Sequence, residues 1–271
     1  MIKGMVSPYD ECIDFEDVRN YGEWDVSIYP IVTRIADNEL KRNNDNLHVS
    51  DLVISPRQYW LKQRHDIYLP YEAWADRYLG TCVHNDIAQA DVGAHELLLV
   101  GKAGGVDVEG MIDYIDYSVA TIVDYKTCQS FLAGWILNGR KDKKTGEMVA
   151  GIENWRPEWT EQVNMYRWLC KQSNIEVRRA VVCLITKDGR GDFGRYIEIE
   201  IPFIDNIEAL VTKRIEILQA HEDVVDDYLP MCDDRWENDL ACREYCDVRG
   251  FCDYAQSLPM TRTEIEKGVE F

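Results

Sequence analysis

The stretch that most constrains the fold runs from Gly110 to Thr127 and reads GMIDYIDYSVATIVDYKT. It predicts two short strands around a turn, because β-branched and aromatic residues dominate both halves. Three charged residues, Asp113, Asp124 and Lys126, interrupt these otherwise apolar strands. A carboxylate between buried positions is costly unless it has a charged partner or a metal. The hairpin therefore predicts a site for a hard cation with a lysine beside it.

The side chains of this hairpin indicate which metal ions it could bind. Two aspartates on adjacent strands suit Mg²⁺ or Mn²⁺, since both ions prefer oxygen ligands. Lys126 follows Asp124 by two residues and is expected on the same face of its strand, where it can orient a water or offset phosphate charge. His84, on a helix predicted upstream, is a further candidate ligand because Mn²⁺ also accepts imidazole. A single helical histidine is more often a structural residue.

The composition is that of an acidic globular protein of 271 residues with a formal net charge of −19. Such acidity works against a simple nucleic-acid-binding protein, because phosphate contacts supply much of that affinity. Contact with DNA would require a local basic surface, a bridging cation or a basic partner. The concentrated basic run of the sequence lies after the hairpin, at Arg140, Lys141, Lys143 and Lys144. It is either a solvated hairpin tip or a loop that contacts phosphate.

The expected location is cytoplasmic. No apolar run approaches the length of a membrane span, and the N-terminus lacks the apolar core of a signal peptide, so no membrane partner is expected. Nine cysteines in a reducing compartment are not expected to pair as disulfides, and a cluster of them favours metal binding.

The order of apolar patterns predicts an α/β fold in which helices flank a mixed central sheet. Helices are expected from Ser55 with Pro56 in the first position, over 71–91, after Pro157 and over 205–227. Further strands are expected at 96–100, 106–108, 180–186 and 195–202. We predict three parts: an acidic, solvated N-terminal extension (1–46) with a short strand at 26–32, a core (47–228), and a cysteine-rich segment packed on it (229–271).

Six residues follow one another in a recognisable order: His84, Asp113, Asp124-x-Lys126 and Gln162-x3-Tyr166. This ordered set resembles the PD-(D/E)XK nuclease superfamily and, within it, the RecB-like nucleases, over residues 50–254. The resemblance implies a restriction-endonuclease-like fold. It implies that His84, Asp113 and Asp124 are metal ligands, with the carbonyl of Tyr125 as an extra ligand, and that Lys126 is catalytic. It also implies that Gln162 and Tyr166, one helical turn apart, line the site and position DNA.

A cysteine cluster stands near the C-terminus, with Cys232, Cys242, Cys246 and Cys252 in the spacing C-x9-C-x3-C-x5-C. Four thiols in so short a segment can surround one ion or cluster. The spacing is not the double C-x2-C of common zinc ribbons.

The resemblance adds a cofactor. RecB-like nucleases of the CRISPR-adaptation and AddB types often have C-terminal cysteines that bind a [4Fe–4S] cluster. One further ligand of that cluster comes from far upstream in the sequence. Here Ser55 stands where that upstream cysteine is expected, so either Cys232 or Cys12 would be the fourth ligand. Zn²⁺ is the alternative to iron–sulfur.

The sequence thus predicts a metal-dependent DNA nuclease, an exonuclease acting on single strands or DNA ends in recombination, repair or degradation. No G-x4-G-K-[ST] phosphate loop is present, so a helicase or recombination partner would act in trans. Two alternatives are a non-catalytic module of the same fold that binds DNA ends or a partner, and an acidic DNA-mimic inhibitor. Digestion polarity, preference for DNA over RNA and oligomeric state are not predicted.

Overall fold

The structure is a computed structural model that describes residues 1–41, 46–141, 146–188, 195–232, 242 and 246–258, without the side chains of Glu72 and Asp76. The chain divides into two compact units. The first comprises residues 1–43, 54–76 and 216–271, and the second comprises 44–53 and 77–215. The predicted division after residues 46 and 228 groups the chain differently and stays a prediction.

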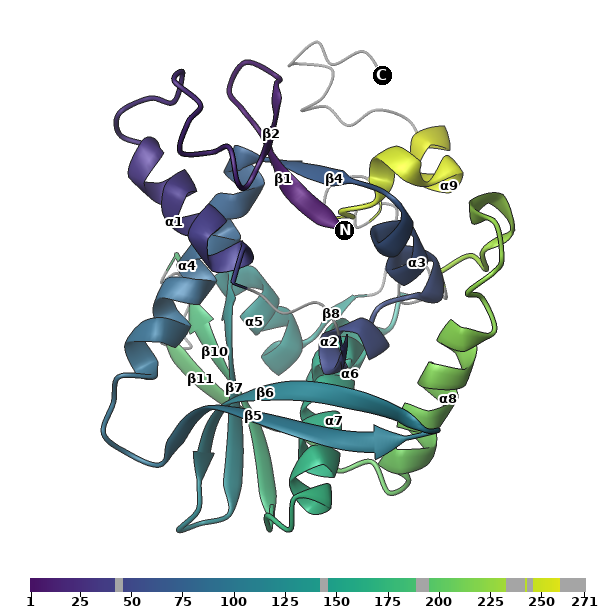
Figure 1. Ribbon diagram of the computed structural model, residues 1–271. Coiled ribbons are helices and arrows are strands. Elements are labelled where there is room, and N and C mark those ends of the chain that lie inside the picture. Colours follow the sequence, from purple (N-terminus) through teal and green to yellow (C-terminus); the bar gives the residue numbers. More distant parts are fainter. Residues whose placement is uncertain (42–45, 142–145, 189–194, 233–241, 243–245, 259–271) are drawn as a thin grey trace. The chain divides into compact units, whose positions relative to one another are not determined.

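The described part of the second unit contains a six-stranded mixed sheet in the order β11-β10-β7-β6-β3, with β5 also paired to β6 (Figure 1). The strands are β3 (Leu47–His48), β5 (Ala94–Ala103), β6 (Val106–Asp116), β7 (Thr121–Cys128), β10 (Arg179–Thr186) and β11 (Tyr196–Glu200). Strand β7 pairs antiparallel with β6 and parallel with β10, and β11 is antiparallel to β10 at the edge. The predicted α/β class with a mixed sheet is confirmed.

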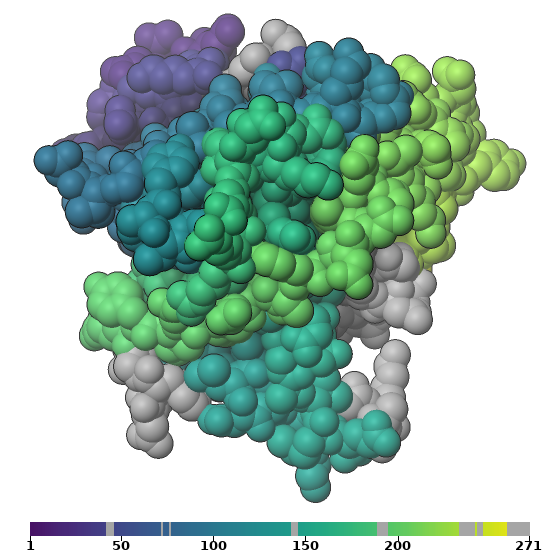
Figure 2. Space-filling view, turned by 90° about the horizontal axis from the view of Figure 1, so that it is seen from below, coloured from purple at the N-terminus to yellow at the C-terminus, as the bar shows by residue number. Residues whose placement is uncertain are grey.

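Helices and a small hairpin complete this unit. They are α2 (Val49–Leu52), α5 (Ser130–Asn138), the hairpin of β8 (Arg140–Lys141) and β9 (Met148–Val149), α6 (Ile152–Trp155) and α7 (Pro157–Gln172). Helices α4 (Tyr71–Ile87) and α8 (Ile207–Gln219) each have one end in this unit and the other in the first. Figure 2 shows the teal surface of α5 and its neighbours.

Helix α7 packs against β5, β6 and β10. It approaches β6 closely at Gly110, where a Cβ atom would lie 2.5 Å from Leu169 Cδ1 and 3.0 Å from Tyr166 Cε1. Any side chain at Gly110 would push the helix away from the strand. Since Gly110 is three residues before Asp113, this contact sets the distance between α7 and the predicted site.

The first unit contains a three-stranded sheet of β1 (Ile2–Val6), β2 (Cys12–Asp14) and β4 (Ile67–Pro70), in the order β2-β1-β4. Its described helices are α1 (Tyr29–Glu39), α3 (Pro56–Arg64), α9 (Asp253–Ser257) and two 3₁₀ turns, η1 (Asp226–Tyr228) and η3 (Arg249–Phe251). Helix α3 begins as predicted, since Ser55 Oγ accepts a hydrogen bond from Gln58 N and Pro56 is the first helical residue. Among the described residues, every helix is too short or too polar to serve as a transmembrane segment.

Two expectations for the N-terminal region are wrong. The first 41 residues are not a solvated extension, because Met5, Phe15, Val18 and Trp24 are buried and the Phe15 ring meets Trp74 edge-on at 5.4 Å. In the sequence these apolar residues are separated by acidic residues at exposed positions, so they form no recognisable apolar pattern. The predicted strand at 26–32 is instead the start of α1, where a proline in the first turn fits the helical φ angle.

Candidate functional site

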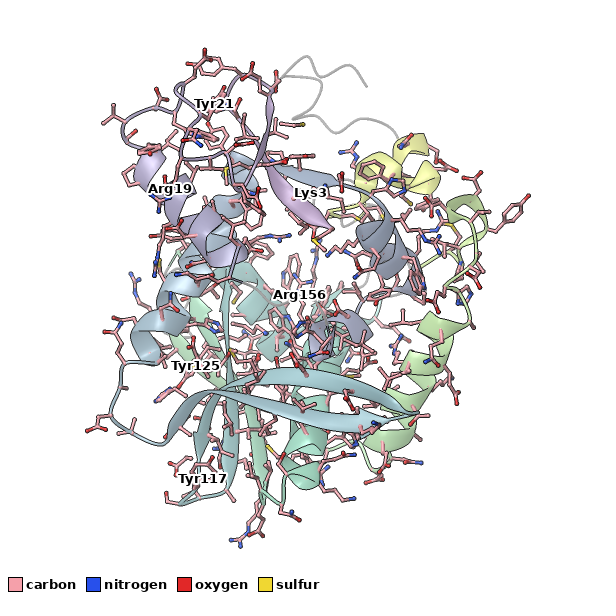
Figure 3. The ribbon with its side chains drawn as sticks, viewed as in Figure 1. Lys3, Arg19, Tyr21, Tyr117, Tyr125 and Arg156 are labelled. Carbon is pink, nitrogen blue, oxygen red and sulfur yellow. The ribbon has the colours of Figure 1, made fainter. Side chains whose placement is uncertain are left out.

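The predicted metal ligands of the second unit meet between α4 and the β6–β7 pair. His84 Nδ1 lies 3.1 Å from Asp113 Oδ1, and His84 Nε2 donates to the carbonyl oxygen of Tyr125 at 3.0 Å. The Tyr125 amide in turn donates to Asp113 Oδ2 at 2.8 Å. The paired register of β6 and β7 ends at Tyr114 and Val123, so the Asp113 carboxylate accepts an amide hydrogen just beyond the ladder. Figure 3 shows Tyr125 on β7.

Asp124 and Lys126 form the second pair of the site, on one face of β7. Asp124 is 3% exposed, and Lys126 Nζ donates to its Oδ1 at 3.1 Å. The same ammonium lies 3.0 Å from Oδ2, yet Oδ2 has no hydrogen bond of acceptable geometry. We take the short distance as an ion pair that lacks good alignment. The buried Oδ2 therefore keeps acceptor capacity for another ligand.

The protonation of these groups follows from their contacts. Both ring nitrogens of His84 face acceptors, and both can donate only when the ring is an imidazolium. The hydrogen bond to Asp113 accordingly raises the pKa of His84. Burial raises the pKa of Asp124 to about 6, against the opposing charge of Lys126. With all four groups ionised, two carboxylates face two cations and the cluster is neutral.

Gln162 and Tyr166 lie one turn apart on α7, as predicted, and Gln162 Nε2 donates to Tyr166 Oη at 2.7 Å. Burial, and then the negative charges of Asp124 and Asp113, raise the pKa of Tyr166 well above its ordinary value. The Tyr166 hydroxyl therefore lies close enough to both carboxylates for their charges to raise its pKa, and it stays protonated at neutral pH. A protonated hydroxyl of this kind is a hydrogen-bond donor for the acidic pair or for a bound substrate.

The buried carboxylate has a cost in stability that can be measured. Because the folded pKa of Asp124 lies above the unfolded value, the folded state loses stability as pH rises from about 4 through 6. We expect Asp124→Asn to be as stable as the parent near pH 4 and more stable above pH 7, by roughly 1–3 kcal/mol. Urea unfolding in chelator across this pH range measures the difference. A variant equally or less stable at every pH would contradict this account of the site.

The predicted basic run is only partly described. Arg140 and Lys141 form β8, and the Arg140 guanidinium lies 4.2 Å from the centre of the Trp135 ring. Lys143 and Lys144 lie outside the described residues.

Sequence reasoning missed two residues that position the site. Gly110 opens the hairpin motif, and its position ahead of Asp113 was a signal for close helix packing. Asp188 accepts from Ser130 N at 3.0 Å and from Ser130 Oγ at 2.8 Å, so it anchors the start of α5 just after β7. It lies in a glycine-rich turn, and no local pattern links it to Ser130.

The predicted cysteine ligands belong to the first unit and gather at the N-terminal end of α3. Ser55 Oγ lies 3.1 Å from Cys232 Sγ. Burial, with smaller contributions from the neighbouring Cys242 and Cys232 thiols, raises the pKa of Cys246 to about 12, so these three groups lie near one another. Arg57, on the same helix, contacts the sulfur of Cys252. Cys12, the alternative ligand, is exposed on β2.

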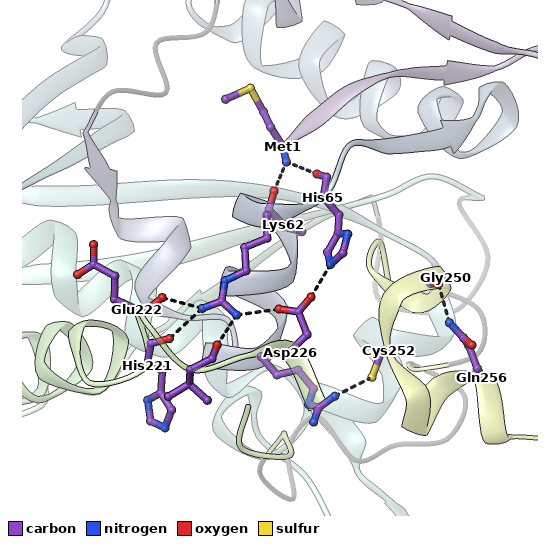
Figure 4. Close-up of polar contacts among 12 residues, drawn as sticks. Met1, Lys62, His65, His221, Glu222, Asp226, Gly250, Cys252 and Gln256 are labelled. Carbon is purple, nitrogen blue, oxygen red and sulfur yellow. Dashed lines mark hydrogen bonds and ion pairs between the residues drawn. The ribbon is translucent and has the colours of Figure 1, made fainter. Parts of the chain in front are cut away.

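Arg57 is a buried arginine, 6% exposed, whose contacts are unusual. Its Nη1 lies 3.8 Å from Cys252 Sγ and its Nη2 donates to the Leu229 carbonyl at 2.8 Å, as Figure 4 shows for the sulfur contact. Its Nε has no hydrogen bond, and among the described residues no carboxylate pairs with it. A buried guanidinium is costly without an anion. The described side chain that contacts it is Cys252, through its sulfur.

Further contacts hold the C-terminal segment on α3. Lys62 pairs with Asp247 at 2.8 Å, and Asp226 accepts from Arg64 at 2.7 Å and from His65 at 2.6 Å. The His65 ring stacks on Phe251 at 4.2 Å. Among the described residues of either unit, no group of three or more His, Cys, Asp or Glu side chains has the geometry to hold a metal ion.

Comparison with known proteins bears on the fold. No protein-family model matches the chain, and no curated protein matches it. The crystal structure of SSO0001 matches with a TM-score of 0.52 at 16% identity, over 87% of this chain and 99% of that one. At this identity the match shows a shared fold alone.

Two weaker structural matches are exonucleases by name. A predicted exonuclease from Eubacterium rectale has a TM-score of 0.37 at 13% identity, over 94% of this chain and 91% of that one. The alkaline exonuclease of Laribacter hongkongensis has a TM-score of 0.40 at 13% identity, over 65% and 89%. Scores below 0.5 do not establish a shared fold.

Proposed function

We propose that this protein is a metal-dependent nuclease that hydrolyses phosphodiester bonds in DNA, of the RecB-like type. The carrying observation is that Asp113 and Asp124, from neighbouring strands, each bind a cationic partner, His84 and Lys126, within one cluster. Two carboxylates can hold a divalent ion that activates water for phosphodiester hydrolysis, and a lysine beside them can stabilise the charge that develops on the phosphate. The same set argues against a non-catalytic module or a DNA mimic, because neither needs a buried Asp–Lys pair.

The donor set fits Mg²⁺ or Mn²⁺. Asp124 has a buried oxygen without a hydrogen bond, and Asp113 and Asp124 supply hard oxygen donors. The His84 imidazole contacts both Asp113 and the Tyr125 carbonyl. A bound ion would supply Lewis acidity and lower the pKa of an attacking water. Its charge would also offset the negative charges of the two carboxylates.

The chain's own residues have separate roles in this proposal. Lys126, held by Asp124, presents an ammonium that orients water and offsets the charge that develops on the phosphate. Tyr166, fixed by Gln162, donates its hydroxyl hydrogen toward the acidic pair or the substrate. Asp113 orients His84 and fixes the Tyr125 peptide.

Incubation of the protein with end-labelled single- and double-stranded DNA tests this function. We expect Mn²⁺ or Mg²⁺ to support degradation and chelator to stop it, with single strands or ends as the preferred substrate. Thermal unfolding provides a readout besides activity, since Mn²⁺ should raise the melting temperature of the parent and not of Asp124→Asn. Absence of cleavage with either metal, together with no thermal shift, would exclude the proposal.

We propose in addition that Cys232, Cys242, Cys246 and Cys252 bind a [4Fe–4S] cluster, with Zn²⁺ as the alternative. The buried Arg57 beside Cys252 supports this, because a buried guanidinium is costly without an anion and a metal-bound cysteine would supply one. The bound group would tie the C-terminal segment to α3. Its function in this protein would be structural, since it closes the first unit.

A further inference from the structure

We propose that Phe131, Trp135 and Trp155, with Arg140, form a base-stacking platform for single-stranded nucleic acid. The inference rests on the proposed nuclease function for its choice of DNA, and it names the strand form that the site receives. The residues come from α5, β8 and α6, which follow β7 directly in the chain.

The rings form one continuous cluster. Phe131 and Trp135 lie 4.8 Å apart between ring centres with a tilt of 55°, and Trp135 and Trp155 lie 5.2 Å apart with a tilt of 41°. Arg140 lies over Trp135, and the Trp155 indole is held by a hydrogen bond to the Val149 carbonyl at 3.0 Å. Both ends of the β8–β9 hairpin are therefore fixed against the aromatic cluster.

The cluster is not a closed core. Phe131 is 55% exposed, and Trp135 and Trp155 are half-buried. Leu137, on the same helix as Phe131, and Met148, on β9, are 42% and 60% exposed. A hairpin tip that contacted only water would not require these apolar side chains at its surface. Exposed aromatic rings beside guanidinium groups are the pattern by which proteins bind single strands, since bases stack on the rings and phosphates pair with the cations.

The positive charges near the aromatic cluster also favour single-stranded nucleic acid as the bound partner. The chain carries a net charge of −19, which repels nucleic acid from most of its surface, whereas the cluster carries Arg140 and is followed by Lys141. Arg156, labelled in Figure 3, comes directly after Trp155, has a side chain 43% exposed and pairs with Glu158 at 3.6 Å. A purely apolar partner would gain nothing from these cations.

The platform is also connected to the acidic site. Phe131 is the fifth residue after Lys126, so their Cα atoms lie within about 18 Å of each other. Burial raises the pKa of Cys128, two residues after Lys126, and the charge of Arg156 opposes that shift, so the guanidinium lies near the end of β7.

The test measures binding without cleavage, with Asp124→Asn as the parent, in chelator. Fluorescence anisotropy compares labelled oligo(dT) with an oligomer of equal length that lacks bases. We expect Phe131→Ala to weaken oligo(dT) binding about 5- to 100-fold and to leave binding of the abasic oligomer unchanged. Arg140→Gln should weaken both. The matched control is Tyr117→Ala, which removes an equally exposed ring (55%) at the β6–β7 turn and should change neither.

Several outcomes would overturn the platform: no binding of oligo(dT) by the parent, preference for duplex, or full oligo(dT) affinity in both Phe131→Ala and Trp135→Leu. Equal losses for oligo(dT) and the abasic oligomer would also overturn it, because stacking requires bases. Melting temperatures confirm that each variant is folded. Metal-dependent cleavage by the wild type is assayed separately, so a failed platform and a failed nuclease assignment give different results.

Discussion

Replacing Lys126 by alanine is expected to reduce DNA cleavage by at least about a hundredfold, the scale of a lost proton-transfer or charge-stabilising group. The Lys126 ammonium donates a hydrogen bond to Asp124 Oδ1 and forms an ion pair with Oδ2, on one face of β7. Its loss leaves the metal ligands in place, so Mn²⁺ should still raise the melting temperature. Single-turnover degradation of labelled single strands measures the effect.

A suitable control for this experiment is Lys102→Ala. Lys102 is a lysine of the same sheet, but it is 66% exposed and pairs at 3.5 Å with an exposed Asp107. Its replacement should leave cleavage unchanged, because an exposed pair contributes little. Full activity in Lys126→Ala would mean that this lysine is not catalytic.

The second large effect is expected at the cysteine cluster. Replacing Cys232 by serine should abolish binding of the iron–sulfur cluster, since it removes one of four ligands. Adding Ser55→Cys in that background should restore binding, because Ser55 Oγ lies only 3.1 Å from Cys232 Sγ and the new thiol would occupy nearly the same place. Metal analysis and the visible absorbance of anaerobically purified protein measure both results without any assay of activity.

Two comparisons make this exchange specific. Cys12→Ser should retain the bound metal, because Cys12 is exposed on β2. If the protein binds zinc in place of iron, with the same loss in Cys232→Ser and the same rescue by Ser55→Cys, the four-cysteine site stands and only the bound metal differs. Metal bound at full occupancy in Cys232→Ser would remove Cys232 from the ligand set.

Local patterns were enough to predict much of the second unit. The β6–β7 hairpin, α7 with Gln162 and Tyr166 on one face, and the buried strand β10 were all expected, because alternation and helical spacing record which side of an element is buried. The N-terminal region was not, because its apolar residues are scattered among acidic ones and are buried by partners distant in sequence, such as Trp74.

The sequence by itself determined which chemical groups are available: two aspartates, a lysine and a histidine in a fixed order, and four cysteines near one end. It could not determine which atoms meet. Only the tertiary structure brought His84 onto Asp113 and Tyr125, set Ser55 against Cys232, buried Arg57 beside Cys252 and assembled three aromatic rings next to β7. The physical reason is that residue spacing fixes the face of a helix or strand, whereas contacts between elements depend on how the whole chain packs.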